Sequence, residues 1–335
     1  MRVYELRGKG LENLVAAERP SPRPGAGEVR VRIRAASLNH RDLAIALGQY
    51  ARSALRYPLV PLSDGAGEVI EVGAGVPRLQ IGDRVMGGFF RDWIDGPATP
   101  ENTAAALGGD IDGVLAEEVV LRADAVVKVP AALSFEEAAT LPCAGVTAWV
   151  GLTVLGDLKP GQTVLALGTG GVSLFVLQIA KALGARVILT SSQDDKLARG
   201  RALGADATIN YKQTPIWDVR ARELTRGHGV DQILEVGGAH TVPLSVRALR
   251  DGGHLTLVGF VSGGRATAEM AHNDRGIRVD SVYVGSARHL QALADAVARF
   301  GIRPVVDQVF LYSEARLAYE HMRGASHFGK IVIRL

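Results

Sequence analysis

Cysteine is almost absent from this chain of 335 residues, which contains a single one, Cys143. One cysteine excludes any disulfide within the chain and any structural zinc site built from four cysteines. Blocks of like charge are absent too, because 38 Lys and Arg are interspersed with 35 Asp and Glu. The net charge is +3 and the pI about 9.1. We therefore expect no nucleic-acid partner, since proteins of that class gather basic residues on one face.

The first residues, MRVYELRGKG, lack the apolar core of a secretory signal. Two long stretches without charged residues, 138–156 and 161–180, are interrupted by glycine or proline. Such interruptions suit loops that join buried elements and do not suit a membrane-spanning helix. The sequence therefore predicts a soluble, cytoplasmic protein with no membrane partner.

Hydrophobic residues make up 47% of the chain and charged residues 22%, which is typical of a globular protein. The length suits two domains. Residues 28–38 alternate Val29, Val31 and Ile33 with arginines, which is the period-two pattern of a half-buried strand. Further strands are predicted at 65–76, 78–89, 116–121 and 125–130, and a long loop at 91–113.

The pattern changes after Pro130. Ser134 and Glu137 are three residues apart, as in the capping box of a helix start. Strands and helices then alternate, which predicts a parallel, doubly wound sheet. The strands are predicted at 163–168, 186–192, 207–211, 230–238 and 252–260, and the helices at 134–141, 173–184 and 194–204. Residues 329–335 again resemble strands of the first part. We predict an α/β protein with one domain formed by 1–128 and 303–335 and another by 129–302.

A glycine-rich loop, Gly168-Thr169-Gly170-Gly171-Val172-Ser173, follows a predicted strand and opens a predicted helix. The first glycine permits a tight turn, and the second lets the backbone approach a pyrophosphate held at the helix N-terminus. Serine stands where the usual fingerprint has its third glycine. The context of strand, loop and helix predicts dinucleotide binding.

The end of the next strand predicts which dinucleotide is bound. Proteins that bind NAD commonly place an acidic residue here for the ribose hydroxyls, but this sequence has Ser191 and Ser192. Lys196 follows within one turn, and Tyr211 ends the third strand. Small hydroxyls beside a cation suit the 2′-phosphate of NADPH, which a carboxylate would repel. NADPH is therefore the predicted cofactor. The alternative for Lys196 is a solvated helix position.

Four polar residues, Asn39, His40, Arg41 and Asp42, meet where an apolar strand ends. Such a group serves as a metal site, a substrate site or a solvated turn. The residues themselves leave these three interpretations open.

Segments along nearly the whole chain resemble the medium-chain dehydrogenase/reductase superfamily, in particular its zinc-independent, quinone oxidoreductase-like branch. They are VRIRAASLNHRDL, PLVPLSDGAGEVIEVGAGV, IGDRV, LPCAGVTAW, VLALGTGGVSLFVLQIAKALGARV and FGKIVIRL. The resemblance implies a chaperonin-10 (GroES)-like β-barrel catalytic domain formed by both chain ends and a Rossmann NADP(H)-binding domain between them. It also implies a cleft for nicotinamide and substrate, and a homodimer. Lys196 and Tyr211 look like the pair that holds the 2′-phosphate in quinone reductase-like members.

In zinc alcohol dehydrogenases of this superfamily, the metal ligands occupy positions that correspond here to Asn39, Ser63 and Cys143. An amide, a hydroxyl and one thiol make a poor site for tetrahedral zinc, although Asp64 or His40 could be recruited. The resemblance therefore implies hydride transfer without a metal, to quinones or to alkenes activated by a carbonyl. Asn39 is predicted to donate a hydrogen bond to the substrate carbonyl, as an oxyanion-hole donor does.

The same resemblance suggests further site residues. His40 is a candidate proton relay or a structural residue, Asp42 is expected to order the loop by pairing with a basic group, and Arg41 is expected at the surface. Cys143 is expected to be a small buried residue near the nicotinamide and the substrate. The aromatic candidates for the substrate wall, for which core packing is the alternative, are Tyr50, Phe89, Phe90 and Trp93. Further cofactor contacts are expected from Thr147, Gly237, Gly259, Phe260, Val284, Gly285 and Lys330. Lys330 is expected to reach the cofactor phosphates or to lie in solvent.

Two other functions stay open. An alcohol or aldehyde dehydrogenase with a degenerate or unusual metal site would contain stoichiometric zinc and would reduce NADP⁺ with alcohols. A non-catalytic NADPH-binding regulatory protein would bind the cofactor tightly and would turn over no acceptor.

Overall fold

The computed structural model describes residues 1–50, 55–259 and 274–335, and two compact units can be distinguished in it. The first unit comprises Met1–Val146 and Val284–Leu335, and the second comprises Thr147–Tyr283. Both ends of the chain therefore belong to one unit.

These limits differ from the division expected from the sequence, which assigned 129–302 to the second domain. Residues 129–146 and 284–302 belong instead with the first unit. They include two helices, α2 (Phe135–Ala138) and α8 (Ala287–Phe300), which contact strands of that unit.

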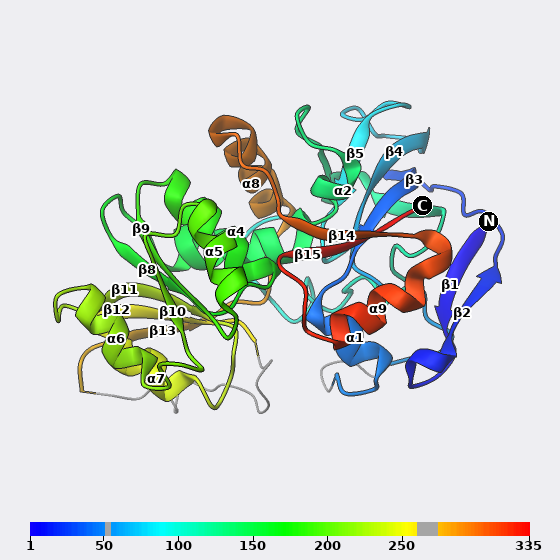
Figure 1. Ribbon diagram of the computed structural model, residues 1–335. Coiled ribbons are helices and arrows are strands. Elements are labelled where there is room, and N and C mark those ends of the chain that lie inside the picture. Colours follow the sequence, from blue (N-terminus) through cyan, green and yellow to red (C-terminus); the bar gives the residue numbers. More distant parts are fainter. Residues whose placement is uncertain (51–54, 260–273) are drawn as a thin grey trace. The chain divides into compact units, whose positions relative to one another are not determined.

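The first unit is built around a β-sheet whose described strands pair in the order β14-β15-β3-β4-β5-β7, with β6 beside β3 (Figure 1). The strands are β3 (Glu28–Ser37), β4 (Asp64–Val72), β5 (Arg84–Gly87), β6 (Glu118–Arg122), β7 (Val126–Lys128), β14 (Val306–Leu311) and β15 (Lys330–Arg334). A hairpin pairs β1 (Arg2–Leu6) with β2 (Leu14–Glu18). The helices α1 (His40–Ala46) and α9 (Ala315–Arg323) complete the unit, and α9 contacts β14 and β15.

β3 pairs with β4, β6 and β15, and it determines which residues meet at one end of this sheet. Its valines and isoleucine are buried, as the alternating pattern predicted. Because β3 is antiparallel to both β4 and β15, Ser37 is the register partner of Asp64 and also of Val332. The residues that follow β3 therefore lie beside the beginnings of β4 and β15.

The helix predicted at 134–141 begins with the predicted capping box. Ser134 Oγ accepts a hydrogen bond from the Glu137 N–H at 3.2 Å, and Glu137 Oε2 accepts one from the Ser134 N–H at 2.9 Å. The α-helix ends early, at Ala138, and three short elements follow. They are the π-helical segment η3 (Leu141–Gly145), α3 (Val146–Trp149) and the π-helical segment η4 (Val150–Leu155). Single π-helical turns occur frequently at functional sites.

The second unit contains a sheet whose described strands are all parallel and pair in the order β10-β9-β8-β11-β12-β13. They are β8 (Thr163–Ala166), β9 (Arg186–Ser191), β10 (Ala207–Asn210), β11 (Val230–Glu235), β12 (Leu249–Leu257) and β13 (Arg278–Ser281). Figure 1 shows α4 (Gly171–Ala182) and α5 (Asp194–Ala202) on one face, with α6 (Trp217–Leu224) and α7 (Val242–Ala248) on the other. The predicted doubly wound parallel sheet is confirmed. Ligands of such sheets bind where the strand order reverses, here at the carboxyl ends of β8 and β11.

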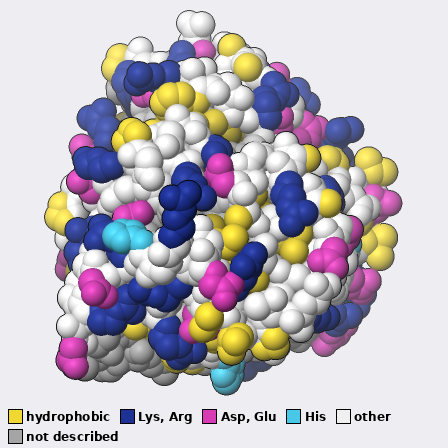
Figure 2. All heavy atoms as spheres, turned by 60° about the vertical axis from the view of Figure 1, so that its left-hand side comes forward, with side chains coloured by type: hydrophobic (Ala, Val, Ile, Leu, Met, Phe, Trp, Pro, Cys, Tyr) yellow, Lys and Arg dark blue, Asp and Glu magenta, His cyan; other side chains and the backbone are white. Residues whose placement is uncertain are grey.

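Charges of both signs are mixed on the surface. Figure 2 shows Lys and Arg side chains interspersed with Asp and Glu over one face. Many of them form ion pairs, such as Lys181 with Asp206 at 2.9 Å and Arg250 with Asp231 at 2.6 Å. In the part of the chain that the structure describes, no helix has both the length and the apolar character needed to cross a membrane.

Candidate functional site

The glycine-rich loop lies at the carboxyl end of β8 and leads into α4. Gly168 has a φ of 74°, in the left-handed region that favours glycine. Gly170 is the N-cap of α4 and has no side chain to bond the first N–H groups of the helix. A Cβ added at Gly168 or at Gly170 would meet nothing within 4 Å. The loop thus offers open space beside a helix N-terminus, which fits the pyrophosphate of a dinucleotide.

The serine that replaces the third glycine keeps the helix close to the strand. Ser173 is 3% exposed, and its Oγ donates to the Leu167 carbonyl at 2.6 Å. The neighbouring strand supports the loop as well, because the Gly168 N–H donates to Thr190 Oγ1 at 3.1 Å. Of the remaining loop residues, Thr169 is 6% exposed, and Gly171 and Val172 are partly exposed in the first turn of α4.

The predicted 2′-phosphate residues lie at the carboxyl ends of β9 and β10. The Tyr211 N–H donates to the Ser191 carbonyl at 3.0 Å, so these two residues are brought together. Lys196 lies in the first turn of α5 and is 7% exposed, which contradicts the alternative of a solvated helix position. Ser192 is partly exposed, and the Tyr211 side chain is 41% exposed.

The sequence pattern did not single out Glu235, a fully buried carboxylate at the end of β11. Its Oε1 accepts hydrogen bonds from the Gly237 N–H at 2.8 Å, the Gly238 N–H at 3.1 Å and Thr241 Oγ1 at 2.6 Å. Its Oε2 accepts one from Ser245 Oγ. Glu235 therefore holds the loop that follows β11 to the beginning of α7. The available signal was an acidic residue at the end of an apolar strand, just before two glycines.

The other predicted cofactor residues are found in both units. Gly259 follows β12, where an added Cβ would lie 2.9 Å from the Val236 carbonyl oxygen, so two strand ends approach closely there. Thr147 is 3% exposed at the beginning of the second unit. Val284 and Gly285 are buried in the first unit, and Val284 has a φ of 58°, which is rare and strained for a β-branched residue. Phe260 lies outside the described residues.

In the first unit, the polar residues after β3 lie at the beginning of α1. Asn39 is the N-cap, with extended backbone, and its N–H donates to Asp42 Oδ2 at 2.8 Å. Both are buried, with exposed fractions of 8% for Asn39 and 1% for Asp42. Asp42 also faces Arg41, whose Nη1 lies 3.7 Å from Asp42 Oδ1. His40 is exposed.

Lys330, the first residue of β15, is part of the same cluster. Its Nζ donates to the Leu38 carbonyl at 2.5 Å and to Asn39 Oδ1 at 2.6 Å, and the residue is 4% exposed. The expectation that Lys330 lies in solvent is wrong, because pairing of β15 with β3 buries it. A contact with cofactor phosphates stays a prediction.

Asp64, the first residue of β4, is fully buried beside Asn39 and Lys330. Its Oδ1 accepts a hydrogen bond from Ser63 Oγ at 2.7 Å, and its Oδ2 accepts one from the Cys143 N–H at 3.1 Å. The structure thus brings together Asn39, Ser63 and Cys143, three residues far apart in the sequence. Cys143 lies in η3 and is partly exposed, whereas a buried residue was expected.

The electrostatics of this cluster follow from its burial. Burial raises the pKa of Asp42 to about 6, although the Arg41 charge opposes the change. Burial also raises the pKa of Asp64, while the charge of Lys330 and the neighbouring polar groups of Asn39 and Ser63 lower it. Desolvation of the sulfur and the Asp64 charge raise the pKa of the Cys143 thiol above its ordinary value.

The prediction that Arg41 lies at the surface is wrong. Its side chain is 9% exposed, and Nη1 donates to the Leu107 carbonyl at 2.8 Å. The guanidinium carbon lies 4.5 Å from the ring centroid of Phe89 and 5.6 Å from that of Tyr50. These rings form cation–π contacts with the guanidinium group. An isolated arginine in a turn carried no signal of aromatic partners contributed by other segments.

The four aromatic candidates for the substrate wall are buried. The exposed fractions are 8% for Tyr50, 1% for Phe89 and for Phe90, and 6% for Trp93. The rings of Phe89 and Phe90 make an edge contact at 4.7 Å, and Phe90 contacts Trp93 at 5.6 Å. The loop 91–113 is attached to α8, because the Ala287 N–H donates to the Trp93 carbonyl at 2.9 Å. These rings pack in the first unit, and a role as substrate wall is a proposal.

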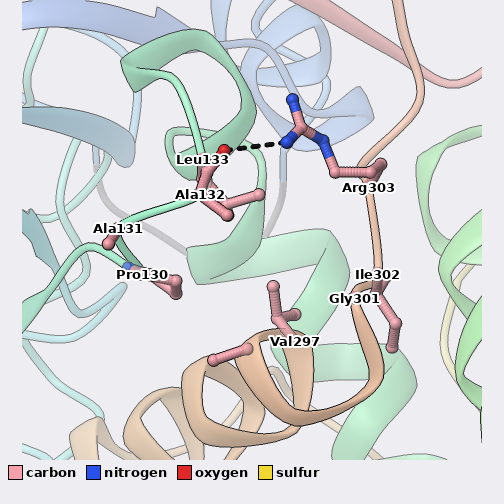
Figure 3. Close-up of a pocket in the computed structure, with 9 residues that line it drawn as sticks. Pro130, Ala131, Ala132, Leu133, Val297, Gly301, Ile302 and Arg303 are labelled. Carbon is pink, nitrogen blue, oxygen red and sulfur yellow. Dashed lines mark hydrogen bonds between the residues drawn. The ribbon is translucent and has the colours of Figure 1, made fainter.

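A separate cavity of about 230 Å³ lies in the first unit, between the segment after β7 and the end of α8 (Figure 3). Of the nine residues that line it, only Arg303 is charged. Arg303 is held by the Ala132 carbonyl at 2.8 Å, the bond drawn in Figure 3, and by Glu137 Oε1 at 2.8 Å. This apolar cavity offers no acid, base or nucleophile.

Two family models match the chain. The alcohol dehydrogenase GroES-like domain matches residues 25–131, and the zinc-binding dehydrogenase model matches residues 171–299. A zinc-type alcohol dehydrogenase-like protein of Schizosaccharomyces pombe is 42% identical over 334 residues, which cover 97% of this chain and 96% of the relative. The chain belongs to the medium-chain dehydrogenase/reductase superfamily.

Solved structures of this superfamily share the fold. An NAD-dependent alcohol dehydrogenase is 33% identical, with a TM-score of 0.89 and full coverage of both chains. The quinone oxidoreductase of Coxiella burnetii is 27% identical, with a TM-score of 0.82 and coverage of 100% of this chain and 99% of that one. This dehydrogenase/reductase therefore combines a GroES-like domain with a Rossmann-like domain. It is an oxidoreductase that uses a nicotinamide cofactor, NAD or NADP.

The family model named for zinc raises the question of whether this chain can hold that ion. In the described ranges of the chain, no group of three or more His, Cys, Asp and Glu residues could hold a metal ion. In the cluster of polar residues of the first unit, Cys143 is the only thiol, both oxygens of Asp64 already accept hydrogen bonds, and the nearby cation is Lys330. Zinc requires three nitrogen, sulfur or carboxylate ligands and an open position. The described residues do not fit a zinc ion.

Proposed function

We propose that this protein transfers hydride from NADPH to quinones, or to alkenes activated by a neighbouring carbonyl, and that it does so without zinc. The observation that carries the proposal is the Asn39 amide. Its Nδ2 is buried and has no hydrogen-bond partner in the part of the chain that the structure describes. A buried donor without a partner is costly, and the oxygen of a carbonyl substrate would satisfy it.

The residues of the first unit suit this chemistry. The cofactor, when bound, supplies the hydride. Asn39 Nδ2 donates a hydrogen bond to the carbonyl oxygen on which negative charge develops, and such preorganised donors stabilise the transition state. Asp42 fixes the Asn39 backbone through the bond at 2.8 Å. His40, exposed at the beginning of α1, is the candidate proton relay.

The preference for NADPH is supported by the second unit. The carboxyl end of β9 carries Ser191 and Ser192 in place of an acidic residue. Lys196 and Tyr211 follow in the adjoining segments, and Tyr211 bonds Ser191 directly. A cation beside hydroxyl groups favours a 2′-phosphate, because charge-assisted hydrogen bonds are the stronger ones.

Alcohol dehydrogenase activity is the second candidate, since relatives carry the names zinc-type alcohol dehydrogenase-like protein and NAD-dependent alcohol dehydrogenase. It requires a metal or another Lewis acid to polarise an alkoxide or carbonyl oxygen. A non-catalytic NADPH-binding protein is the third candidate.

The test is NADPH oxidation by protein treated with EDTA, with an ortho-quinone, a simple enone and an aldehyde offered in parallel. We expect turnover of the quinone or the enone, unchanged by EDTA or added zinc, and less than stoichiometric zinc by elemental analysis. NADH in place of NADPH should give a lower kcat/KM.

The other candidates give different results in the same assay. Aldehyde reduction that is lost with EDTA and returns with zinc would establish the alcohol dehydrogenase. Tight NADPH binding with no turnover of any acceptor would establish the non-catalytic protein.

A further inference from the structure

We propose that Lys330 is a positioning residue for the reduction. Its ammonium group takes the place of a metal ion as the cation of the site, and it orients the Asn39 amide so that Nδ2 is presented to the substrate oxygen. This inference rests on the function proposed above, because it names the residue that prepares Asn39 for its role. It begins from one contact, between Lys330 Nζ and Asn39 Oδ1 at 2.6 Å.

The two ends of the Asn39 amide differ in what they can bond. An ammonium group has three donors and no acceptor, so it can bond only the oxygen of Asn39. The nitrogen is then left for another acceptor, because it makes no hydrogen bond with the described residues, although the Asp64 carboxylate lies nearby. If the amide turned, Oδ1 would face the substrate oxygen and would repel the charge that develops there. Lys330 prevents this turn.

The contact between Lys330 and Asn39 is held rigidly. Lys330 Nζ makes another hydrogen bond to the Leu38 carbonyl at 2.5 Å, and the residue is 4% exposed. The backbones are joined as well, since the Leu38 N–H donates to the Ile331 carbonyl at 3.0 Å. The ammonium group and Asn39 are thus held by two paired strands, which suits a preorganised donor.

Lys330 also places a positive charge beside the amide. Its Nζ lies 2.6 Å from Asn39 Oδ1, and the residue is 4% exposed, so this charge is buried. A buried charge acts more strongly than one in water, because the surroundings screen it less. A cation beside the amide donor therefore favours negative charge on the substrate oxygen, as a Lewis-acid metal does in other enzymes.

The experiment compares Lys330→Met, which keeps the length of the side chain and removes its charge and donors, with Lys330→Arg. We expect Lys330→Met to lower kcat for the quinone or enone by about 10²–10³-fold, the usual cost of one oxyanion-stabilising contact. The Kd of NADPH, measured by fluorescence titration, should not change. Lys330→Arg should recover part of kcat, since it keeps a cation and its donors. Lys128→Met is the matched control, because Lys128 has a side chain 56% exposed and pairs with Asp83.

Two results of this comparison would overturn the inference. An unchanged kcat in Lys330→Met would show that Asn39 needs no positioning. A normal kcat with a much weaker affinity for NADPH would show that Lys330 serves the cofactor instead. If Lys330→Met does not fold because Asp64 loses its counter-charge, the double variant Lys330→Met/Asp64→Asn removes both charges, and the low kcat must persist in it.

A second measurement is independent of turnover, so it separates this inference from the proposed function. The wild-type protein, Asn39→Ala, Lys330→Met and the double variant Asn39→Ala/Lys330→Met form a cycle. Urea unfolding midpoints of the four proteins are compared. Contacting residues have non-additive effects on stability. We expect the double variant to lose less than the sum of the single losses. Strict additivity would contradict the contact even if the wild-type protein turned over no acceptor.

Discussion

Lys196 is nearly buried in the first turn of α5, the helix that follows β9, so its charge is poorly screened. This is the residue on which a distinction between NADPH and NADH should depend most. Ser191 and Tyr211 lie together at the ends of β9 and β10, and neither carries a charge that would repel a phosphate.

We expect Lys196→Ala to raise the KM for NADPH by roughly 10–100-fold, the loss of about 1.5–3 kcal/mol for a hydrogen bond to a charged group. The KM for NADH should change little, because NADH lacks the 2′-phosphate. Steady-state kinetics with both cofactors measures the difference. Lys181→Ala is the control, since Lys181, which lies on α4, pairs with Asp206. Equal losses with the two cofactors would show that Lys196 does not contact the 2′-phosphate.

Asp42 makes stability depend on pH in a direction opposite to that of an ordinary ion-paired carboxylate. Burial raises its pKa in the folded protein from 3.8 to about 6. The folded state therefore binds the proton more tightly than the unfolded state. The resulting stabilisation is fully present below about pH 4 and is lost as pH rises through about 6.

The variant Asp42→Asn removes this titration and keeps a side-chain acceptor for the Asn39 N–H. Between pH 4 and pH 7 the wild-type protein should lose about 2 kcal/mol of unfolding free energy relative to the variant, as the difference in pKa requires. Urea unfolding of both proteins at several pH values measures it. Parallel curves would mean that the carboxyl group titrates normally in the folded protein.

At the scale of elements, the connection between β8 and α4 has space that a methyl group can enter. A Cβ at Gly170 meets nothing within 4 Å, and its backbone conformation is ordinary, with a φ of −77°. Gly67 in β4 is the opposite case, because a Cβ there would lie 2.0 Å from the Arg32 carbonyl oxygen of β3. Gly67 is therefore needed for folding, and Gly170 for the ligand.

We expect Gly170→Ala to unfold at the wild-type temperature and to bind NADPH at least about tenfold more weakly, a loss of about 1.4 kcal/mol. The new methyl group would occupy space needed by the pyrophosphate. Gly67→Ala should instead lower stability by about 1–3 kcal/mol through steric overlap. Thermal unfolding and fluorescence titration together separate the two effects. Unchanged NADPH affinity in Gly170→Ala would refute the assignment of this loop.

The elements that the sequence predicted well are those whose signals are local. The alternation in β3, the capping box at Ser134 and the glycine loop each lie within a dozen residues. The early end of the helix at Ala138 was not predicted, because the π-helical segments that follow show no distinct periodicity. Glu235 accepts hydrogen bonds from residues two to ten positions further along the chain. Its role could therefore have been predicted, because an acidic residue just before two glycines is a local signal.

At the scale of the whole molecule, the superfamily and the pairing of a GroES-like with a Rossmann-like domain were predictable from motifs along the chain. The contact between Asn39 and Lys330 was not predictable from the sequence. Lys330 is 291 positions away, and only the register between β3 and β15 brings the two together. Arg41 illustrates the same limit, since its ring contacts with Tyr50 and Phe89 depend on tertiary packing. The homodimer stays a prediction, for which sedimentation velocity is the direct measurement.

The division of the first unit into two chain segments has a consequence for biosynthesis. Residues 284–335 leave the ribosome only after every strand of the second unit has been made. Domains generally fold as units while the chain grows, so the second unit can acquire its parallel sheet while β3 still lacks β15. During that interval Asp42 and Asp64 have no Lys330 beside them, and the hydrogen bond between Lys330 and Asn39 cannot yet form. On the function and the role of Lys330 proposed above, a nascent chain that ends before β15 would bind nucleotide before it could reduce a substrate.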